Sequence, residues 1–467
     1  MIVNEDHCKP MKTLRSTIEK LALLALSAHL AIGTPARAQE ITKEEYGHRR
    51  ARVMQELDDG ILLLHARTAE KAMEQWGFLQ DASFLYFSGL PNLAGAVLAL
   101  DGKRREARLF MPPPPISFGV AVENNGIEIS ARSASERGLS SVEPWDRLVP
   151  WVKSRMAEGE DRIYLDGSRR PEATGAPPGM RAVAGDRTLW QASVEAAFPE
   201  MEVASAKEVI QRLRWAKSPA EAEILGRNAK ATAAALVAVA EALRPGMTQR
   251  ESESVVTAAC VQAGAQGPSF WPWTMSGPNA HTGRLVGAFF QYDHLNRTMS
   301  RDEVVRVDIG CAGGYYGADV GRTLPVSGHF NPGQREAWNL LIAAYRAGLQ
   351  AIRATVPLDE VRQASVDEII RLQPGLRTEQ GREAARVLLS RGTGVWHIHG
   401  VGIESGEAAV DPLASGSVIA YEPTIEVGPD AFYLEDMILV TEAGHRVLST
   451  GLPYTAEEIE RVMGGGR

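Results

Sequence analysis

Several features that would indicate a particular class of protein are missing from this sequence. No run of lysines and arginines stands out among its 467 residues, and the formal net charge is −8, which argues against nucleic acid as a partner. Beyond the N-terminal region, no apolar run is long enough to span a membrane. No internal repeat of solenoid period is visible. What remains is a chain of ordinary composition whose length suits two globular domains.

Cysteine is also scarce, and Cys8, Cys260 and Cys311 are the three in the chain. Cys8 falls in a segment that we expect to be removed. A bond between the other two would need an oxidising compartment and Cα atoms within about 7 Å, and nothing in the sequence indicates that proximity. We therefore expect Cys260 and Cys311 to be free, buried thiols.

The N-terminus has the three-part pattern of an export signal. A basic stretch, MKTLRSTIEK, begins at Met11 and is followed by the apolar stretch LALLALSAHLAIG, which is too short to span a bilayer. Ala36-Arg37-Ala38 then offers a small-x-small cleavage site before Gln39. The alternative is an amphipathic first helix. We predict a signal peptide over residues 1–38, cleaved after Ala38, and a periplasmic or secreted protein.

The first of the two domains is expected over residues 39–205 as an α/β unit. DASFLYFSGL and GAVLALDG are predicted strands, and the second ends in an Asp-Gly turn. Residues 168–188 are rich in glycine and proline, which predicts a long exposed loop.

The second domain is expected over residues 206–455 and begins with helices. Ser218–Glu221 and Thr248–Glu251 are capping boxes that each predict a helix start. Strands are expected over 270–328 and again over 395–448, with two helices between them. Residues 456–467 are expected to form a tail.

The stretch RVDIGCAGGYYGADVGRTLPVSG places two aspartates on either side of two glycines. Gly313-Gly314 is a strong signal for a two-residue hairpin turn. That register would set Asp308 directly opposite Asp319, with Cβ atoms about 5 Å apart. Like charges this close are unfavourable unless a cation lies between them, and a divalent metal is the simplest candidate. A surface hairpin with solvated aspartates is the alternative.

A second pair of acids follows the same logic. Glu422 and Glu435 face each other if their hairpin turns at Gly428-Pro429. Both lie in apolar, β-prone runs, where an unpaired carboxylate is unfavourable. His397 and His399 alternate along a further strand and share one of its faces.

One histidine and four carboxylates make a ligand set of nitrogen and oxygen atoms. Such a set suits a pair of Mn²⁺, Co²⁺, Fe²⁺ or Zn²⁺ ions bridged by acids. Four carboxylates balance two divalent ions, and a water bridging the ions would lose a proton easily, which suits the hydrolysis of an amide.

These motifs give the second domain a resemblance to the pita-bread metallopeptidases: methionine aminopeptidase, aminopeptidase P, prolidase and relatives. Over about 206–448, DIGCAGGYYGADVGRTLPVSGHF resembles the family's aspartate hairpin, HGVGIESGE its His-Gly motif, and YEPTIEVG and LEDMILVTEAG its glutamate strands. QDASFLYFSGL resembles the creatinase-type N-terminal domain of the aminopeptidase P and prolidase branch. The resemblance implies an α/β fold in which a creatinase/prolidase-like domain precedes a pita-bread catalytic domain.

Carried over to this chain, the resemblance implies the metal ligands Asp308, Asp319, His399, Glu422 and Glu435. Asp319 and Glu435 would bridge two divalent ions, with Mn²⁺ the first expectation. Asp308 would bind one ion, and His399 with Glu422 the other. Glu422 would also act as general base and then general acid. His397 matches no family ligand, and we expect a packed or hydrogen-bonded strand histidine.

The residues that would face the substrate depart from the family pattern. Gly406 stands where related peptidases usually carry a second histidine, and Tyr433 where aminopeptidase P and prolidase carry arginine. Losing a carbonyl-polarising donor costs about 10²–10³ in rate unless another group replaces it, and the Tyr433 phenol can donate one hydrogen bond. His281 and His294 are the candidates for a further substrate-binding histidine, and a solvated loop histidine is the alternative for each.

The leading hypothesis is an exported Xaa-Pro aminopeptidase with a dinuclear metal site and a metal-bridging hydroxide as the nucleophile. A dipeptidase is disfavoured because Val401–Tyr421 contains no Lys or Arg to hold the dipeptide's carboxylate, as prolidases do. Creatinase activity is disfavoured because creatinase uses the fold without these ligands. The alternatives are hydrolysis of a non-peptide substrate, such as a phosphotriester or ester, and a metal-binding homologue without turnover. By analogy, we expect a homodimer or higher homo-oligomer.

Overall fold

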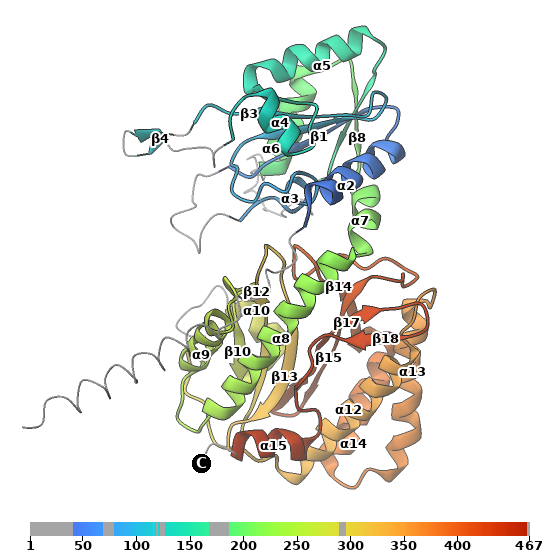
Figure 1. The fold of residues 1–467 in the computed structure, drawn as a ribbon. Coiled ribbons are helices and arrows are strands. Elements are labelled where there is room, and N and C mark those ends of the chain that lie inside the picture. Colours follow the sequence, from blue (N-terminus) through green and yellow to red (C-terminus); the bar gives the residue numbers. More distant parts are fainter. Residues whose placement is uncertain are drawn as a thin grey trace, which may run out of the picture. The chain divides into compact units, whose positions relative to one another are not determined.

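The structure is a computed structural model, and it describes residues 41–68, 79–114, 116–117, 120–121, 127–167, 186–288 and 296–464 (Figure 1). The predicted signal peptide, 1–38, lies outside the described residues, as do positions 168–185 of the expected loop. Within the described ranges, no helix is long and apolar enough to cross a membrane.

The N-terminal domain is built on one mixed sheet. Across the described residues its six strands lie in the order β6-β3-β2-β1-β7-β8. Along β1, Leu62 packs into one apolar cluster and Leu63 into another. Because both faces of the sheet are buried, its central strands are continuous apolar runs. The strands are β1 (Ile61–His65), β2 (Val97–Asp101), β3 (Glu106–Met111), β6 (Ser141–Pro144), β7 (Arg162–Leu165) and β8 (Glu202–Ser205).

Helices accompany this sheet, together with a short hairpin. The helices are α2 (Lys43–Glu56), α3 (Ala82–Ser88), α4 (Ala131–Glu136), α5 (Leu148–Ala157), α6 (Asp186–Ala197) and the 3₁₀ turn η1 (Trp145–Arg147). The hairpin is β4 (Ile116–Ser117) and β5 (Val120–Ala121). The predicted boundary between residues 205 and 206 falls directly after β8 and stays a prediction.

The stretch DASFLYFSGL forms helix α3, so the predicted strand is wrong. The Asp81 carboxylate accepts hydrogen bonds from the backbone N–H groups of Ser83 and Phe84, and Gly89 ends the helix in the left-handed conformation. All seven residues of the helix are buried. A helix without a polar face shows no helical periodicity, which explains the error.

Two sheets form the centre of the C-terminal domain. In the described residues one has the order β10-β11-β13, and the other has β14-β15-β17-β18 with β16 also paired to β15. The sheets meet where Gly321 and Glu435 exchange backbone hydrogen bonds of 3.2 and 2.9 Å. The strands are β9 (Gly267–Pro268), β10 (Trp273–Ser276), β11 (Val304–Ile309), β12 (Cys311–Ala312), β13 (Val320–Pro325), β14 (Trp396–Gly400), β15 (Val418–Val427), β16 (Asp430–Tyr433), β17 (Asp436–Val440) and β18 (His445–Val447).

Helices pack against both sheets of this domain. Helices α8 and α9 contact the three-stranded sheet, while α12, α13 and α14 group beside the other (Figure 1). Both predicted capping boxes, at Ser218 and Thr248, are confirmed. The helices are α7 (Lys207–Trp215), α8 (Pro219–Ala242), α9 (Gln249–Gln262), α10 (Thr282–Ala288), α12 (Pro332–Ala351), α13 (Leu358–Leu372), α14 (Glu379–Arg391) and α15 (Ala456–Gly464), with the 3₁₀ turns η2 (Gly277–Ala280), η3 (Gln373–Gly375) and η4 (Gly392–Val395).

The expected tail, residues 456–467, begins with helix α15. Its Ile459 and Met463 are buried in the core of the C-terminal domain. The described part of this segment is therefore packed structure.

The β11–β13 hairpin turns one residue later than predicted. Its register pairs Asp308 with Gly321, not with Asp319. Gly313 and Tyr316 close the turn through mutual backbone hydrogen bonds of 3.1 Å, and Gly314 and Tyr315 both have positive φ. The reason is packing: a Cβ on Gly313 would lie 2.7 Å from the Asn228 side-chain oxygen, so this glycine serves a close contact beside the turn.

Cys260 and Cys311 form a disulfide, so the expectation of two free thiols is wrong. Their Cα atoms lie 5.4 Å apart, within the range that a disulfide spans. Strand β12, which contains Cys311, pairs with β9, which follows closely after α9 and its Cys260. This pairing between distant segments leaves no mark in the sequence pattern.

Candidate metal centre

The five predicted ligands come from five places around the junction of the two sheets. Asp308 lies on β11, Asp319 directly before β13, His399 on β14, Glu422 on β15, and Glu435 between β16 and β17. Different strands therefore supply the side chains, and the junction at Gly321 and Glu435 brings these strands together.

The predicted register of the glutamate hairpin is confirmed. Thr424 pairs with Tyr433 across β15 and β16, and Tyr421 pairs with Asp436 across β15 and β17. The same register sets Glu422 opposite Glu435. Strand β14 adds its histidines from the other edge of β15, where His397 pairs with Glu422.

His399 is surrounded by carboxylates. Its Nε2 lies 3.3 Å from Glu422 Oε1, 3.6 Å from Glu435 Oε1 and 3.9 Å from Asp319 Oδ2. Ligand atoms of Asp319, His399 and Glu435 lie within 4.8 Å of one another, as do those of His397, His399 and Glu422. These spacings fit residues that share a metal ion.

Two buried oxygen atoms support the same interpretation. Asp319 Oδ1 and Glu435 Oε1 are buried and have no hydrogen-bond partner within the described residues. A buried carboxylate oxygen without a partner is costly, and a bound cation would remove that cost. The residues present therefore fit divalent metal ions.

The pKa values of the acids reflect their mutual repulsion. Burial and the nearby charge of Glu422 raise the pKa of Glu435 to about 7. Burial, with Glu435 and Asp308 close by, raises the pKa of Asp319 well above its usual range. Burial also raises the pKa of Asp308, against the opposing charge of Arg306. Without a cation, Glu435 is partly protonated near pH 7, and Asp308 and Asp319 keep their protons to a higher pH than usual.

The pKa shifts of His399 and Glu422 favour their charged forms, unlike those of the other three acids. Burial disfavours the charged imidazole of His399, but Glu422 and Glu435 outweigh it and raise the pKa to about 11. Burial would raise the pKa of Glu422, yet hydrogen bonds from His397, His399 and Tyr433 lower it well below the usual range. The His399 Nδ1 lies 3.0 Å from the Gly400 carbonyl oxygen, which orients Nε2 toward the acids.

His397 lies at the rim of this cluster. Its Nδ1 is 2.5 Å from Glu422 Oε1, and its side chain is 62% exposed. It is thus a hydrogen-bonded strand histidine that faces solvent.

Tyr433 contacts two predicted ligands at once. Its hydroxyl lies 2.6 Å from Glu422 Oε2 and 2.7 Å from Glu435 Oε2. The residue is 1% exposed. This places a phenol where aminopeptidase P and prolidase carry arginine.

Arg306 is a residue that our sequence analysis missed. Its Nη2 donates to Asp308 Oδ2 at 2.9 Å, and its guanidinium lies over the Tyr433 ring. The signal was present, because a lone arginine interrupts the apolar strand VVRVDI.

A buried ion pair fixes the backbone beside Glu435. Arg322 donates to the Glu435 carbonyl oxygen at 2.7 Å and to Asp436 Oδ1 at 3.0 Å. Asp436 also accepts hydrogen bonds from Tyr345, Ser449 and Tyr454. Because this polar network is satisfied, the strand ends that carry the acids are held in one position.

The loop that contains Gly406 is anchored by Glu407. Arg214 and Lys217 bind the Glu407 carboxylate at 2.6 and 2.7 Å, and despite its burial their charges lower its pKa to about 2. A Cβ added to Gly406 would meet no atom within 4 Å. Space is therefore open where related peptidases carry a histidine.

The structure describes one of the two candidates for a substrate-binding histidine. His281 Nε2 lies 3.2 Å from the Pro429 carbonyl oxygen and its Nδ1 lies 3.5 Å from Glu426 Oε2, so it contacts the β15–β16 turn and no predicted ligand. His294 lies outside the described residues.

Comparison with known proteins finds a matching family model for each of the two domains. Residues 223–442 match metallopeptidase family M24, and residues 46–118 match the aminopeptidase P N-terminal domain. A Xaa-Pro aminopeptidase from Haemophilus influenzae is 25% identical over 453 residues, covering 91% of this chain and 98% of that protein. One from Escherichia coli is 24% identical over 463 residues, covering 92% and 99%.

Solved structures show the same two-domain arrangement. A variant of Escherichia coli aminopeptidase P in complex with substrate has a TM-score of 0.71 at 21% identity, covering 92% of this chain and 99% of that one. Proline aminopeptidase P II from Yersinia pestis has a TM-score of 0.71 at 20% identity, covering 90% and 99%. The predicted α/β fold, a creatinase/prolidase-like domain before a pita-bread domain, is confirmed.

Proposed function

We propose that this metallopeptidase, whose residues 223–442 match metallopeptidase family M24, is a dinuclear aminopeptidase that removes an N-terminal residue ahead of proline. The observation that carries the proposal is the convergence of three carboxylates, from Asp319, Glu422 and Glu435, on His399 Nε2. Buried oxygens of Asp319 and Glu435 have no hydrogen-bond partner in the described residues. The Xaa-Pro relatives supply the substrate class.

In this proposal two divalent ions, with Mn²⁺ the first candidate, are held by Asp308, Asp319, His399, Glu422 and Glu435. When bound, they would supply Lewis acidity to activate water and polarise the scissile carbonyl. Hydrogen bonds from His397, His399 and Tyr433 keep the pKa of Glu422 low, so this acid is ionised and has a vacant site for a proton. It would then return the proton to the leaving nitrogen. Tyr433 holds Glu422 and Glu435 in one orientation through its hydroxyl.

A second candidate is hydrolysis of a non-peptide substrate such as a phosphotriester or ester. The open space at Gly406 and the phenol at Tyr433 favour it, because both change the surface that would contact the substrate. The predicted ligands are the same in both proposals.

We also propose that the mature protein is exported. The Cys260–Cys311 disulfide supports this, because disulfides persist mainly in oxidising compartments. The signal peptide over residues 1–38 and a homodimeric or larger assembly stay predictions.

The test is release of the first residue from an Xaa-Pro-Yaa tripeptide by the mature chain, residues 39–467, loaded with Mn²⁺ or Co²⁺. Metal analysis should give two ions per chain, and Asp319→Ala should lose metal and activity together. A folded, metal-loaded protein that releases nothing from the tripeptide, yet hydrolyses a phosphotriester or ester, would move the assignment to the second candidate.

A further inference from the structure

Arg306 is a buried cation in strand β11, whose other residues are apolar except for Asp308. Its side chain is 9% exposed, and it lies on β11 between Val305 and Val307, which are both fully buried. Side chains two residues apart on a strand share one face, so Arg306 points to the same side as Asp308. A cation in such a place needs partners, and the partners here all belong to the candidate metal centre.

The guanidinium contacts both an acid and a ring. Its Nη2 donates to Asp308 Oδ2 at 2.9 Å, and its Cζ lies 3.9 Å from the centroid of the Tyr433 ring. This is close stacking of a planar cation on an aromatic face, which lysine cannot reproduce. The Arg306 Nε is buried and has no hydrogen-bond partner within the described residues, so stacking and the ion pair are what stabilise the group.

The Tyr433 ring is also tightly packed against Gly321. A Cβ on Gly321 would lie 2.0 Å from the ring's Cε1, so only glycine leaves room for it. The Tyr433 backbone N–H donates to Thr323 Oγ1 at 2.7 Å. With backbone and ring both held, the hydroxyl is directed at Glu422 and Glu435.

We propose that Arg306 is a positioning residue of the catalytic centre, which from β11 supplies the positive charge that related peptidases supply from the position of Tyr433. It holds Asp308 by an ion pair and holds the Tyr433 ring by stacking. Through that ring it keeps the hydroxyl directed at Glu422 and Glu435. The proposal rests on the proposed function for its meaning in catalysis, but its contacts can be tested by metal binding alone.

The experiment compares Arg306→Gln and Arg306→Lys with the wild-type chain. The dissociation constants for Mn²⁺ and Co²⁺ are measured by competition with a chelator, the Co²⁺-loaded protein is examined by visible absorption, and kcat and KM are measured separately. Because a positioning partner of a metal ligand typically contributes 10–100-fold, Arg306→Gln should weaken metal binding by about that factor and alter the Co²⁺ spectrum. Arg306→Lys keeps the charge and should recover part of the loss.

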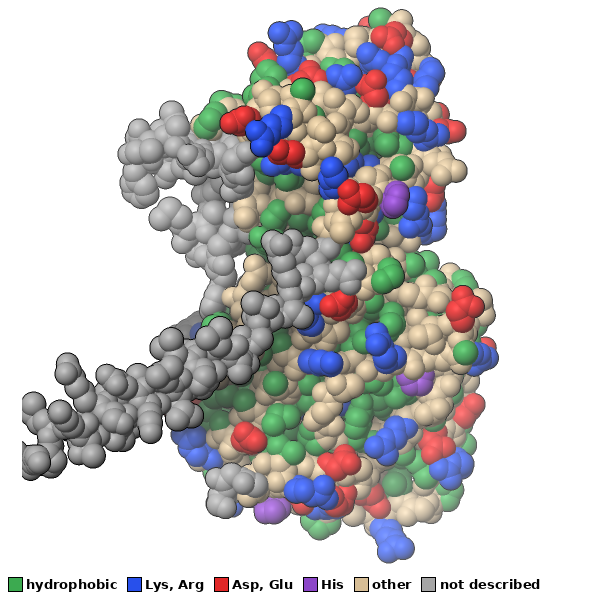
Figure 2. Space-filling view, in the orientation of Figure 1, with side chains coloured by type: hydrophobic (Ala, Val, Ile, Leu, Met, Phe, Trp, Pro, Cys, Tyr) green, Lys and Arg blue, Asp and Glu red, His purple; other side chains and the backbone are tan. Residues whose placement is uncertain are grey.

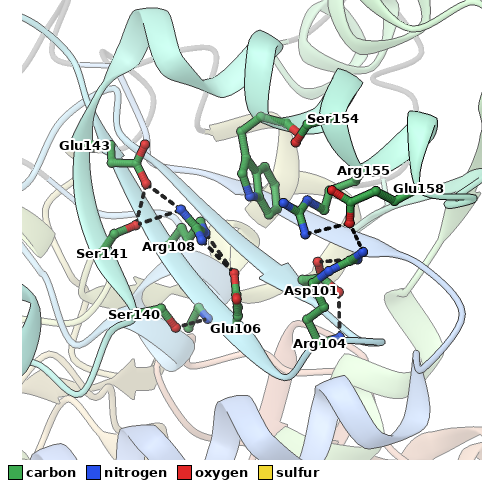
Figure 3. Close-up of polar contacts among 12 residues, drawn as sticks. Asp101, Arg104, Glu106, Arg108, Ser140, Ser141, Glu143, Ser154, Arg155 and Glu158 are labelled. Atoms are coloured by element: carbon green, nitrogen blue, oxygen red, sulfur yellow. Dashed lines mark hydrogen bonds and ion pairs between the residues drawn. The ribbon is translucent and has the colours of Figure 1, made fainter.

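A matched control lies in the N-terminal sheet. Arg108 on β3 also stacks on an aromatic ring, with Cζ 5.7 Å from the Trp151 ring, and pairs with Glu106 and Glu143 at 2.7 Å (Figure 3). Arg108→Gln removes the same kind of contacts away from the predicted ligands, and should leave metal binding and the spectrum unchanged.

A double-mutant cycle with Tyr433→Phe tests whether Arg306 acts through the tyrosine. If it does, Arg306→Gln costs less in the Tyr433→Phe background than in the wild type. An equal cost in both backgrounds would overturn the proposal, as would wild-type metal binding and spectrum in Arg306→Gln, or an equal loss in Arg108→Gln. If the wild-type chain releases no residue from a tripeptide, the proposed function fails, while metal binding and the spectrum still decide the role of Arg306.

Discussion

The position of the Tyr433 ring depends on the absence of a side chain at Gly321. The phenol takes the place of the family's arginine, and its ring fills the space above the Gly321 backbone. In sequence they are 112 positions apart, so neither residue alone indicates the fit.

Gly321→Ala should therefore disturb the site as well as the fold. The new Cβ would lie 2.0 Å from Tyr433 Cε1, so the ring must move. Overpacking of this kind costs about 1–3 kcal/mol, and displacement of the hydroxyl should lower kcat/KM at least tenfold. Thermal unfolding and tripeptide kinetics measure the two effects. Gly444→Ala is the control, because a Cβ there meets nothing within 4 Å. An unchanged Tm and rate in Gly321→Ala would contradict the fit described here.

Substitution of the two histidines of β14 should affect metal binding differently. His399 is buried and faces three carboxylates, whereas His397 is 62% exposed and contacts Glu422. We expect His399→Ala to lose at least one metal ion per chain. His397→Ala should change metal affinity by no more than about fivefold, since exposed charge pairs contribute little. Metal analysis after dialysis distinguishes the two, and loss of metal in His397→Ala would make it a ligand.

At the level of strands and turns, the two hairpins differ in how well their registers could be predicted. The β15–β16 hairpin turns at Gly428-Pro429 as expected, because no tertiary contact competes for its glycine. The aspartate hairpin has a Gly-Gly pair, but Asn228 packs against Gly313 and donates to the carbonyl oxygens of Gly313 and Tyr316. A partner 85 residues away thus selects the turn, and local sequence cannot show it.

The predicted ligands do not depend on this register, because their identity came from the sequence motifs. Asp308, Asp319, His399, Glu422 and Glu435 were named from their spacing and from the family resemblance, and the structure brings them together. The role of Arg306 and the disulfide were not predicted, because both depend on contacts between separate strands and helices. Helix α3 was predicted as a strand, because burial on every side removes the helical periodicity on which prediction depends.

The Cys260–Cys311 disulfide ties helix α9 to strand β12, just beyond the strand that carries Asp308. Its cysteines are 51 residues apart, so removing it should lower the free energy of unfolding by about 2–4 kcal/mol. Urea unfolding of the Cys260→Ser/Cys311→Ser double variant measures the loss. The wild type under strong reductant should match the double variant. Equal stability of oxidised and reduced wild type would show that the bond adds nothing to the fold.

At the scale of the whole molecule, the acids visible on the surface and the acids in the interior are distributed differently. On the face shown in Figure 2, acidic and basic side chains are interspersed without an extended patch of one sign. The buried acids of the candidate metal centre are the contrast, because four carboxylates share one site with His399 and Arg306. The stability of the entire chain should therefore depend on pH and metal together.

The metal-free protein should lose stability as the pH rises from about 4.5 to 7. The pKa of Glu435 is raised from 4.5 to about 7, so the folded state binds this proton more tightly than the unfolded chain. That contribution is fully present below pH 4.5 and is lost as the pH rises through 7. A shift of this size corresponds to about 3 kcal/mol, and the raised pKa of Asp319 acts in the same direction.

Adding Mn²⁺ should reverse this loss, because the ion binds the ionised acids and displaces their protons. The gain in Tm should be larger at pH 8 than at pH 5. Glu435→Gln removes the titrating group, so it should flatten the pH dependence of the metal-free protein. Glu106→Gln in the N-terminal sheet is the control and should keep the wild-type slope. A Tm gain from Mn²⁺ that is equal at both pH values, or a Glu435→Gln profile parallel to the wild type, would show that these acids do not share a cation site.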